Sequence, residues 1–431
     1  MGWESCRTHR RKNPRIVRIN MPKPLNIVLL SYHNQNGGAG IACGRLAEAL
    51  KKAGHQVNIL VQEKTGNDNS IALNSTLWSK AMSWLQFILE RLVYLPVEKN
   101  KADRFLFNPG RFGHDLSQHP LILQADIIHL HWVNFGMLSI QNIKQLLHTG
   151  KPVYWTLHDM WAFTGGCHHS GTCEKYQAQC GTCESFIKHP HTNDLSHQIW
   201  EEKMQAFQQP NLHIITCSDW LKGRAMHSSI LKYQPIQSIP NAIDTELFKP
   251  IDKKKAKHVL GLDLSKNHIL FVAMRVNAPK KGFHYLENAL TGLDKKTTEL
   301  FVVGNAQDLP ELPLKTHKLG HINSPEKMIQ IYQAADVFVT PSLEENLPNT
   351  IMEAMACGTP CVGFHIGGIP EMIDHKINGY VAEYQSVEDL QKGLIWTLIN
   401  KPENAARAKS EATYSESMIA AKHVNYYTHV G

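Results

Sequence analysis

The chain has 431 residues, of which 42% are hydrophobic and 19% are charged, and its formal net charge is +7. This length predicts two or three domains with substantial cores. No stretch reaches the roughly 18 apolar residues that a membrane-spanning helix needs. Much of the positive charge lies in residues 1–21, which contain no apolar signal-peptide core and are expected to be a disordered leader. We therefore expect no nucleic-acid partner and, with nine cysteines and no export signal, a cytoplasmic protein.

The first elements predict a βαβ unit. Residues 25–31 form a short apolar run typical of a buried strand, residues 41–53 a helix, and residues 56–61 a second strand. Between the first strand and the helix lies a glycine turn with Gly37 and Gly38, where backbone N–H groups can approach an anion. The turn is not GxGxxG, so a nicotinamide site is disfavoured, and glycines that serve only the turn remain the alternative.

A strongly apolar helix is predicted over residues 77–95, followed by a segment that mixes basic and aromatic residues. The basic residues are Lys99, Lys101, Arg104 and Arg111, and the aromatic ones are Phe105, Phe107 and Phe112. One interpretation is a peripheral membrane surface for a lipid-linked acceptor. The other is a helix packed in the core beside a solvated basic loop.

Two successive strands are predicted to end in histidine. Residues 125–132 contain His131, and residues 152–159 end in His158 and Asp159. The carboxyl ends of parallel strands line the ligand crevice of an α/β sheet. The sequence therefore predicts these three side chains at a binding edge.

A polar, glycine-rich loop at residues 165–185 contains four cysteines within seventeen residues. They are Cys167, Cys173, Cys180 and Cys183. Four thiolates suit tetrahedral zinc. Because the loop is too polar to be ordered by burial of apolar side chains, it needs another source of order. A structural zinc is the preferred interpretation, with two disulfides or free thiols as the alternatives.

The second half begins a new α/β pattern after a proline-flanked junction at residues 238–250. Residues 212–218 are predicted to form the last strand of the first half. In the second half, a strand at residues 268–275 ends in Arg275, and Lys281 follows just before a helix. Such a pair can neutralise a leaving diphosphate. The sequence contains no Asp-x-Asp, which fits a reaction that requires no metal cofactor.

Residues 341–371 hold two carboxylates, Glu345 and Glu353, on either side of a predicted helix start. Pro348 suits a first helical turn, and Asn349 or Thr350 could cap it. The helix N-terminus favours an anion, and ionised carboxylates accept hydroxyl protons. The block therefore predicts a ligand that has both phosphate and sugar hydroxyls.

Residues 341–371 resemble the signature of the retaining glycosyltransferases of family 4. The matching elements are Pro341-Ser342, the two glutamates, Glu353 to Pro360, and Gly367-Gly368-Ile369-Pro370-Glu371. The resemblance covers the chain from about residue 25 onward. It implies an α/β protein of the GT-B fold, with two Rossmann-like domains facing a central cleft. The cysteine loop resembles an insertion in members that make exopolysaccharides of the colanic-acid kind.

The resemblance also implies roles for individual residues. Catalysis is expected to involve His158, Glu345, Arg275 and Lys281, and the acceptor side to include His131 and Asp159. The donor, an NDP-sugar, is expected to contact Gly37, Gly38, Arg275, Lys281, Gly304, His321, Ile322, Glu345, Asn346, Leu347, Pro348, Asn349, Thr350 and Glu353. Many family members have Glu-Gly-Phe-Gly where this chain has Glu345 to Pro348, so the sugar cannot be inferred.

The expected domains are residues 22–216 for the acceptor, 217–408 for the nucleotide sugar, and a C-terminal helix at 409–431 that returns to the first domain. The predicted activity is transfer of a hexosyl group, with retention, from an NDP-sugar to a glycan or lipid-linked glycan in cell-surface polysaccharide synthesis. The alternatives are a GT-B-fold sugar-nucleotide epimerase and a non-catalytic protein that binds sugar nucleotides.

Overall fold

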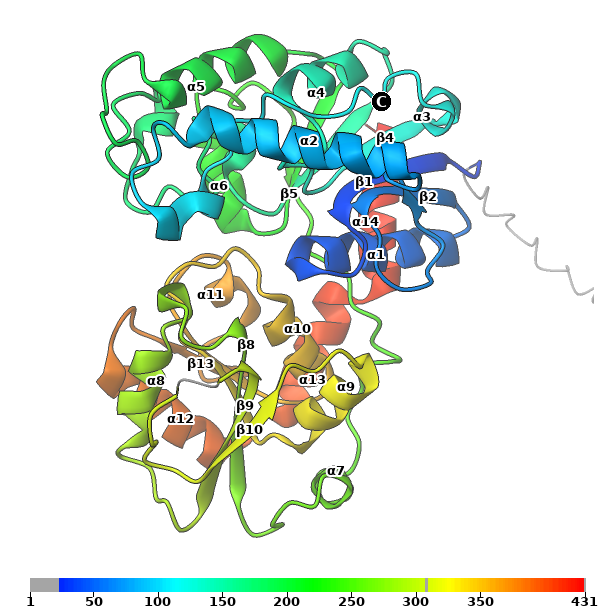
Figure 1. Cartoon of the computed structure of the whole chain (residues 1–431). Helices are drawn as coiled ribbons and strands as arrows, with labels where there is room; N and C mark the ends of the chain where they lie inside the picture. The colour runs from blue at the N-terminus through cyan, green and yellow to red at the C-terminus, as the bar shows by residue number, and fades with distance from the viewer. Residues whose placement is uncertain (1–22, 307–308, 430–431) are drawn as a thin grey trace, which may run out of the picture.

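The computed structural model describes residues 23–306 and 309–429, and the expected leader at residues 1–21 lies outside this part of the chain. Two α/β domains lie one above the other in Figure 1. Each is built on a sheet whose strands are all parallel, as expected when crossover helices cover both faces. Among the described residues, no helix is both long and apolar enough to cross a membrane.

The first domain has a seven-stranded sheet in the order β3-β2-β1-β4-β5-β6-β7. The strands are β1 (Asn26–His33), β2 (Gln56–Glu63), β3 (Ile71–Ala72), β4 (Ile127–Leu130), β5 (Val153–Leu157), β6 (Leu212–Thr216) and β7 (Ile236–Ser238). The helices are α1 (Gly37–Lys52), α2 (Leu77–Tyr94), α3 (Pro120–Gln124), α4 (Ile140–Leu147), α5 (Leu195–Ala206) and α6 (Asp219–His227), with 3-10 turns η1 (Lys101–Leu106), η2 (Trp161–Phe163) and η3 (Lys175–Gln177).

The second domain has a six-stranded sheet in the order β10-β9-β8-β11-β12-β13. Its strands are β8 (Asn267–Arg275), β9 (Thr298–Asn305), β10 (Thr316–Gly320), β11 (Val337–Thr340), β12 (Cys361–Phe364) and β13 (Gly379–Ala382). Its helices are α7 (Lys253–Val259), α8 (Phe283–Leu290), α9 (Pro325–Ala334), α10 (Asn349–Ala356), α11 (Ile369–Met372), α12 (Val387–Asn400) and α13 (Glu403–Tyr414), with the turn η4 (Pro279–Lys281).

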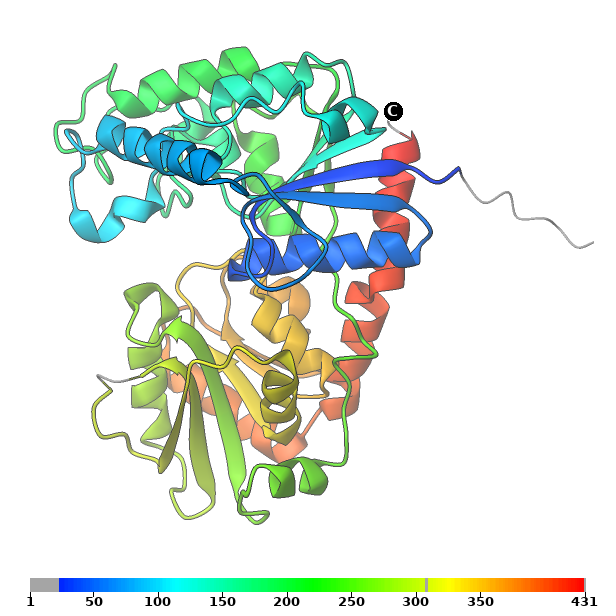
Figure 2. The ribbon, with the colours of Figure 1, turned by 45° about the vertical axis from the view of Figure 1, so that its right-hand side comes forward.

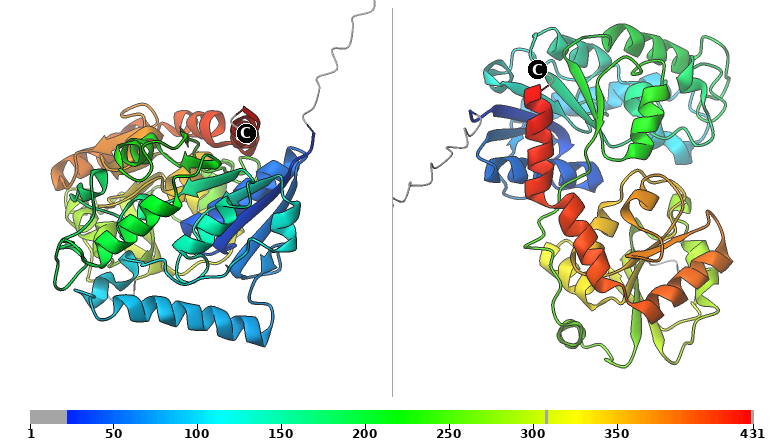
Figure 3. Two further views of the ribbon diagram at one scale, coloured as in Figure 1. Left: turned by 90° about the horizontal axis from the view of Figure 1, so that it is seen from above. Right: turned by 180° about the vertical axis from the view of Figure 1, so that it is seen from behind.

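Helix α14 (Glu416–His429) leaves the second domain and packs on the first. The views from the side and from behind show it running up along the first sheet (Figures 2 and 3). Its Ile419 and Tyr427 are buried with Ile27 and Tyr154 of the sheet and with residues of α1. The C-terminal segment therefore completes one core layer of the N-terminal domain. It contains two helices, α13 and α14, where the sequence predicted one.

Two expected boundaries are wrong. The first sheet continues through β7, so the chain leaves the first domain after Ser238 and not at residue 217. Helix α1 begins at Gly37, so the expected glycine turn is the first turn of the helix. A side chain at Gly40 would lie 2.9 Å from the carbonyl oxygen of His33, which explains why a helical position there holds glycine.

Candidate active site

The start of α10 lies against the glycine segment of the first domain. The Asn349 side-chain amide donates to the carbonyl of Gly38 (3.0 Å) and accepts from the amide of Asn241 (3.0 Å). The N-cap of α10 is Pro348, and no side chain caps the helix. The prediction that Asn349 or Thr350 caps it is therefore wrong, because Asn349 bridges the domains instead. The first-turn N–H groups of α10 thus have no capping side chain.

Glycines let the loops of the second domain approach one another closely. Gly367 has φ +58°, and a Cβ there would lie 1.7 Å from the carbonyl oxygen of Glu345. Gly282 has φ +63°, and its Cβ would lie 1.9 Å from the carbonyl oxygen of Pro341. Any side chain at either position would push these loops apart. The two glycines, which have no side chain, therefore allow the loops that carry Lys281 and Glu345 to pack closely.

Both signature carboxylates are already paired with basic residues. Glu345 forms an ion pair with Lys281 and accepts from the Ser342 hydroxyl (3.1 Å). Glu353 accepts from Arg45 of α1 (2.6 Å) at one oxygen and from the Tyr332 hydroxyl (2.9 Å) at the other. A carboxylate can accept about four hydrogen bonds, so both retain room for a ligand hydroxyl.

The remaining donor-side residues share the carboxyl edge of the second sheet. Arg275 ends β8 and is exposed, and Gly304 lies at the end of β9. His321 and Ile322 follow β10 directly. Leu347, by contrast, is 8% exposed and its side chain packs in the core of the second domain.

The two predicted histidines lie side by side at the carboxyl edge of the first sheet. His131 follows β4 and His158 follows β5, and Nδ1 of His131 lies 3.0 Å from Nε2 of His158. Burial lowers the pKa of His158 to about 4, so the ring is neutral near pH 7. Its backbone carbonyl accepts from the Asn346 amide (3.2 Å) of the second domain. The acceptor-side strand end and the donor-side loop therefore touch.

Asp159 is held at this edge by three hydrogen bonds, and its side chain is 15% exposed. Its carboxylate accepts from the Trp132 indole (2.9 Å), the Trp161 backbone N–H (2.8 Å) and His168 (2.7 Å). Burial alone would raise its pKa, but the charge and hydrogen bond of His168 outweigh it and lower the pKa to about 2. Asp159 is therefore an ionised positioning residue.

Several contacts across the domain interface escape the sequence analysis. Asn346 is 7% exposed and accepts from the Ser218 hydroxyl (2.5 Å) of the first domain. Glu371 accepts from the backbone N–H groups of Asp219 (2.8 Å) and Trp220 (2.7 Å) at the start of α6. The signature flags Glu371, but nothing local marks its partners.

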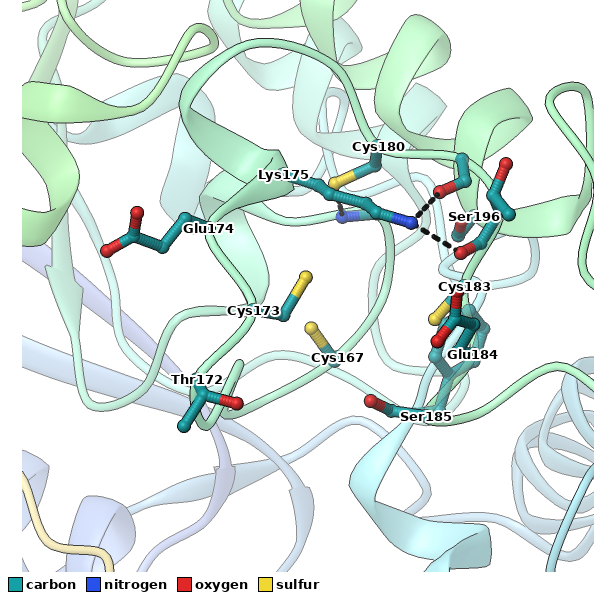
Figure 4. A pocket seen from close by; sticks show the side chains of 14 residues that line it. Cys167, Thr172, Cys173, Glu174, Lys175, Cys180, Cys183, Glu184, Ser185 and Ser196 are labelled. Carbon is teal, nitrogen blue, oxygen red and sulfur yellow. Dashed lines mark hydrogen bonds between the residues drawn. The ribbon is translucent and has the colours of Figure 1, made fainter.

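The four loop cysteines line one cavity of about 310 Å³ in the first domain (Figure 4). All cysteines in the part of the chain that the structure describes are free thiols. In that same part, no three His, Cys, Asp or Glu side chains already stand at metal-ligand spacing. The predicted cluster therefore exists as a group of neighbouring thiols.

Comparison with known proteins identifies the family. A model described as Glycosyltransferase Family 4 matches residues 36–247, and one described as Glycosyl transferases group 1 matches residues 266–400. Together they span most of the chain, which belongs to this family of glycosyltransferases with the GT-B fold. The sequence prediction of fold and family is thereby confirmed.

Individual relatives are distant but cover most of the chain. A putative colanic acid biosynthesis glycosyl transferase, WcaC of Escherichia coli, is 24% identical over 75% of this chain and 82% of its own. A D-inositol 3-phosphate glycosyltransferase of Pseudarthrobacter chlorophenolicus is 27% identical over 84% of both.

Solved structures show the same fold. A sucrose-phosphate synthase from Thermosynechococcus elongatus has a TM-score of 0.62 at 18% identity and covers 93% of this chain and 98% of its own. Anabaena HepE, solved in complex with UDP and glucose, has a TM-score of 0.59 at 18% identity and covers 94% and 100%.

Proposed function

We propose that this glycosyltransferase moves a hexosyl group from an NDP-sugar to a glycan or lipid-linked glycan, with retained anomeric configuration, in cell-surface polysaccharide synthesis. The observation that carries the proposal is the uncapped start of α10, which lies four residues beyond the Lys281-paired Glu345 and contacts Gly38 in the first turn of α1. Positive charge, free backbone N–H groups and carboxylates together suit a diphosphate joined to sugars. The WcaC and HepE relatives support this class of substrates.

In this proposal each charged group has a separate task. Arg275 and Lys281 neutralise the leaving diphosphate, which makes a metal cofactor unnecessary for the transfer. Glu353 accepts from the ribose hydroxyls, Glu345 from the donor sugar, and His158 lies beside the anomeric carbon. The leaving phosphate takes the acceptor proton as the hydroxyl attacks from the same face. Glu345 is not assigned as a nucleophile, because attack from the same face accounts for retention; Lys281 and Ser342 both contact its Oε1.

The surface of α2 supports an acceptor at the cytoplasmic face of a membrane. The buried residues of α2 are Ser83, Glu90 and Tyr94, whereas large apolar side chains point outward. The exposed ones include Leu77 (88%), Trp78 (77%) and Trp84 (67%). Figure 3 shows α2 at the edge of the first domain, away from the second sheet. A helix with its apolar side outward favours the interfacial interpretation over the core one.

The decisive test is nucleotide release. A thermal-shift screen of nucleotide sugars first identifies the donor, because a tight ligand raises the melting temperature. We then expect NDP to be released rapidly only when a glycan acceptor is present. Lys281→Ala should lower this rate at least 100-fold, on the order of 3 kcal/mol of transition-state stabilisation.

Lys280→Ala is the matched control, because Lys280 is the adjacent lysine and also pairs with a neighbouring glutamate, Glu344. It should retain the rate within about threefold. Equal activity of wild type and Lys281→Ala would refute the site. Conversion of the sugar nucleotide without an acceptor would indicate an epimerase, and binding without any product would indicate a non-catalytic protein.

A further inference from the structure

The cysteine loop has little regular structure of its own. Between η2 and α5 it contains only the short turn η3, and long stretches are irregular. Figure 4 shows its four cysteine side chains around one cavity. Lys175 ties the loop internally through the carbonyl oxygens of Gly181 (3.3 Å) and Thr182 (2.7 Å). None of these residues belongs to the proposed transferase site, so the cluster needs a separate explanation.

The sulfur atoms lie among hydrogen-bond donors. The backbone N–H of Gly165 donates to Sγ of Cys180 (3.2 Å), and those of Ser185 and Phe186 donate to Cys183. The Thr164 hydroxyl donates to the backbone carbonyl of Cys167 (2.6 Å) and so positions that residue. Outer hydrogen bonds of this kind commonly accompany metal-bound thiolates.

A buried lysine lies next to the cluster. Lys203 of α5 is fully buried, donates to the carbonyl oxygens of Trp161 and Thr164, and interacts electrostatically with Cys167 and Cys180. Four thiolates around one divalent cation carry a net charge of −2. The lysine and the sulfur-directed donors would offset part of that charge, which would otherwise be costly to bury.

We propose that Cys167, Cys173, Cys180 and Cys183 bind one divalent cation of the zinc type as four thiolates. Sulfur ligands select soft or borderline metals, and four of them complete a tetrahedral shell. Because the described side chains are not yet at metal-ligand spacing, binding draws the sulfurs inward and releases their four protons. The ion is therefore structural, with no open position for a substrate.

The ion would brace the acceptor side of the proposed site. Cys167 is followed by His168, which bonds to Asp159 (2.7 Å) and through its backbone to Met160 (2.9 Å). His169 lies close enough to Glu344 of the second domain to interact electrostatically. A bound ion that holds Cys167 in place would also hold His168 and His169 in place at the domain interface. Loss of the ion should thus weaken acceptor use more than donor binding.

Metal analysis tests the proposal without any assay of transfer. Protein purified without added metal should contain about one zinc per chain, and the metal-stripped protein should bind Co²⁺ with the charge-transfer absorption of thiolate ligands. Cys173→Ser and Cys183→Ser should each lose most of the zinc. Cys361→Ser, which removes a buried thiol from β12, should keep it. Under denaturing conditions with chelator, all nine cysteines should react as free thiols.

Four results would overturn the proposal. The first is less than half an equivalent of zinc in folded wild-type protein, and the second is zinc retained by both loop variants. The third is five reactive thiols, the number left by two disulfides. The fourth is iron together with inorganic sulfide. Because wild-type protein alone answers three of these, a loop variant that fails to fold does not block the test. If the protein binds one zinc but shows no transferase activity, the proposed function is refuted and the zinc proposal is not.

Discussion

Glu353 of the second domain forms an ion pair with Arg45 of the first domain. Arg45 and Glu353 have side chains that are 15% and 13% exposed, so solvent screens their attraction less than it would on the surface. The guanidinium of Arg45 also lies over the Phe248 ring, 5.1 Å from its centroid. Arg45 therefore orients the Glu353 carboxylate for the ribose hydroxyls from which we propose it accepts hydrogen bonds.

We expect Arg45→Met to raise the KM for the NDP-sugar about tenfold, with a smaller effect on kcat, because a positioning residue is lost and the chemistry is not. Steady-state kinetics at saturating acceptor measures both constants. Lys51→Met on the same helix is the control, since its ion pair with Glu48 is on the surface and its loss should change neither. An unaltered KM in a stably folded Arg45→Met protein would contradict this role.

For individual residues, the sequence predicts the charged groups of the candidate site better than it predicts the side chains that contact them. Motif spacing identifies Lys281, Glu345 and Glu353, because the chemistry of a sugar diphosphate needs those residue types. It cannot identify Arg45, which lies 308 positions from Glu353 and is one arginine among many on helices. The same holds for Ser218, which contacts the side chain of Asn346 only because the two domains meet. Long-range pairs of this kind leave no local pattern.

Among the elements, α2 departs most from the usual orientation of an amphipathic helix. Its buried Glu90 accepts from the backbone N–H groups of Arg111 (2.9 Å) and Phe112 (3.0 Å), so its polar side faces the protein. The predicted basic and aromatic segment contributes less than expected, because Phe107 is fully buried and Arg111 pairs with Glu202. Phe105 does extend the exposed apolar surface, at 59% exposure.

We expect the protein to sediment with vesicles that contain anionic lipid and to bind neutral vesicles less well. The double variant Trp78→Ser, Trp84→Ser should reduce binding at least tenfold, because two interfacial indoles are lost. It should leave activity on a water-soluble acceptor intact. Tyr233→Ser, which removes an exposed aromatic from the connection between α6 and β7, is the control. Equal vesicle binding by both variants would argue against a membrane role for α2.

The element pattern is largely predictable, because short apolar strands alternate with helices along the chain. The exceptions have physical causes. The sequence marks residues 36–40 as a turn because glycine disfavours helix, yet close packing on β1 requires glycine in the first turn of α1. Strand β7 has three residues and escapes notice because so short a segment carries no periodicity.

At the scale of the whole molecule, a group of neutral histidines lies buried where α14 packs on the first sheet. His129 contacts the Tyr427 hydroxyl (2.6 Å) and the Thr156 hydroxyl (2.7 Å), and His423 of α14 lies beside it. Burial lowers the pKa of His423 to about 4 and the pKa values of His129 and His131 well below the usual value. Protonation of any of them in place would bury an uncompensated charge.

Stability should therefore fall on acidification. An unfolded histidine binds a proton near pH 6.5, whereas folded His423 does so near pH 4, so its stabilising contribution is full above pH 6.5 and is lost progressively toward pH 4. The loss for His423 is at most about 3 kcal/mol. Urea unfolding between pH 7.5 and pH 5 measures it. His423→Leu should flatten this dependence, and exposed His258→Leu should not. The same steep dependence in His423→Leu would contradict this account.

The route of α14 also constrains how the protein is made. A ribosome releases the N-terminal domain first, but Ile419 and Tyr427, which close one layer of its core, emerge only after the whole second domain has been synthesised. Until then α1 covers only part of the face of the first sheet that includes Ile27 and Tyr154. The first domain therefore stays incompletely folded during translation and is accessible to chaperones. The second domain can finish folding before the first does. Assembly of the cleft is thus the last step of synthesis, because the helix that completes one domain is delivered by the other.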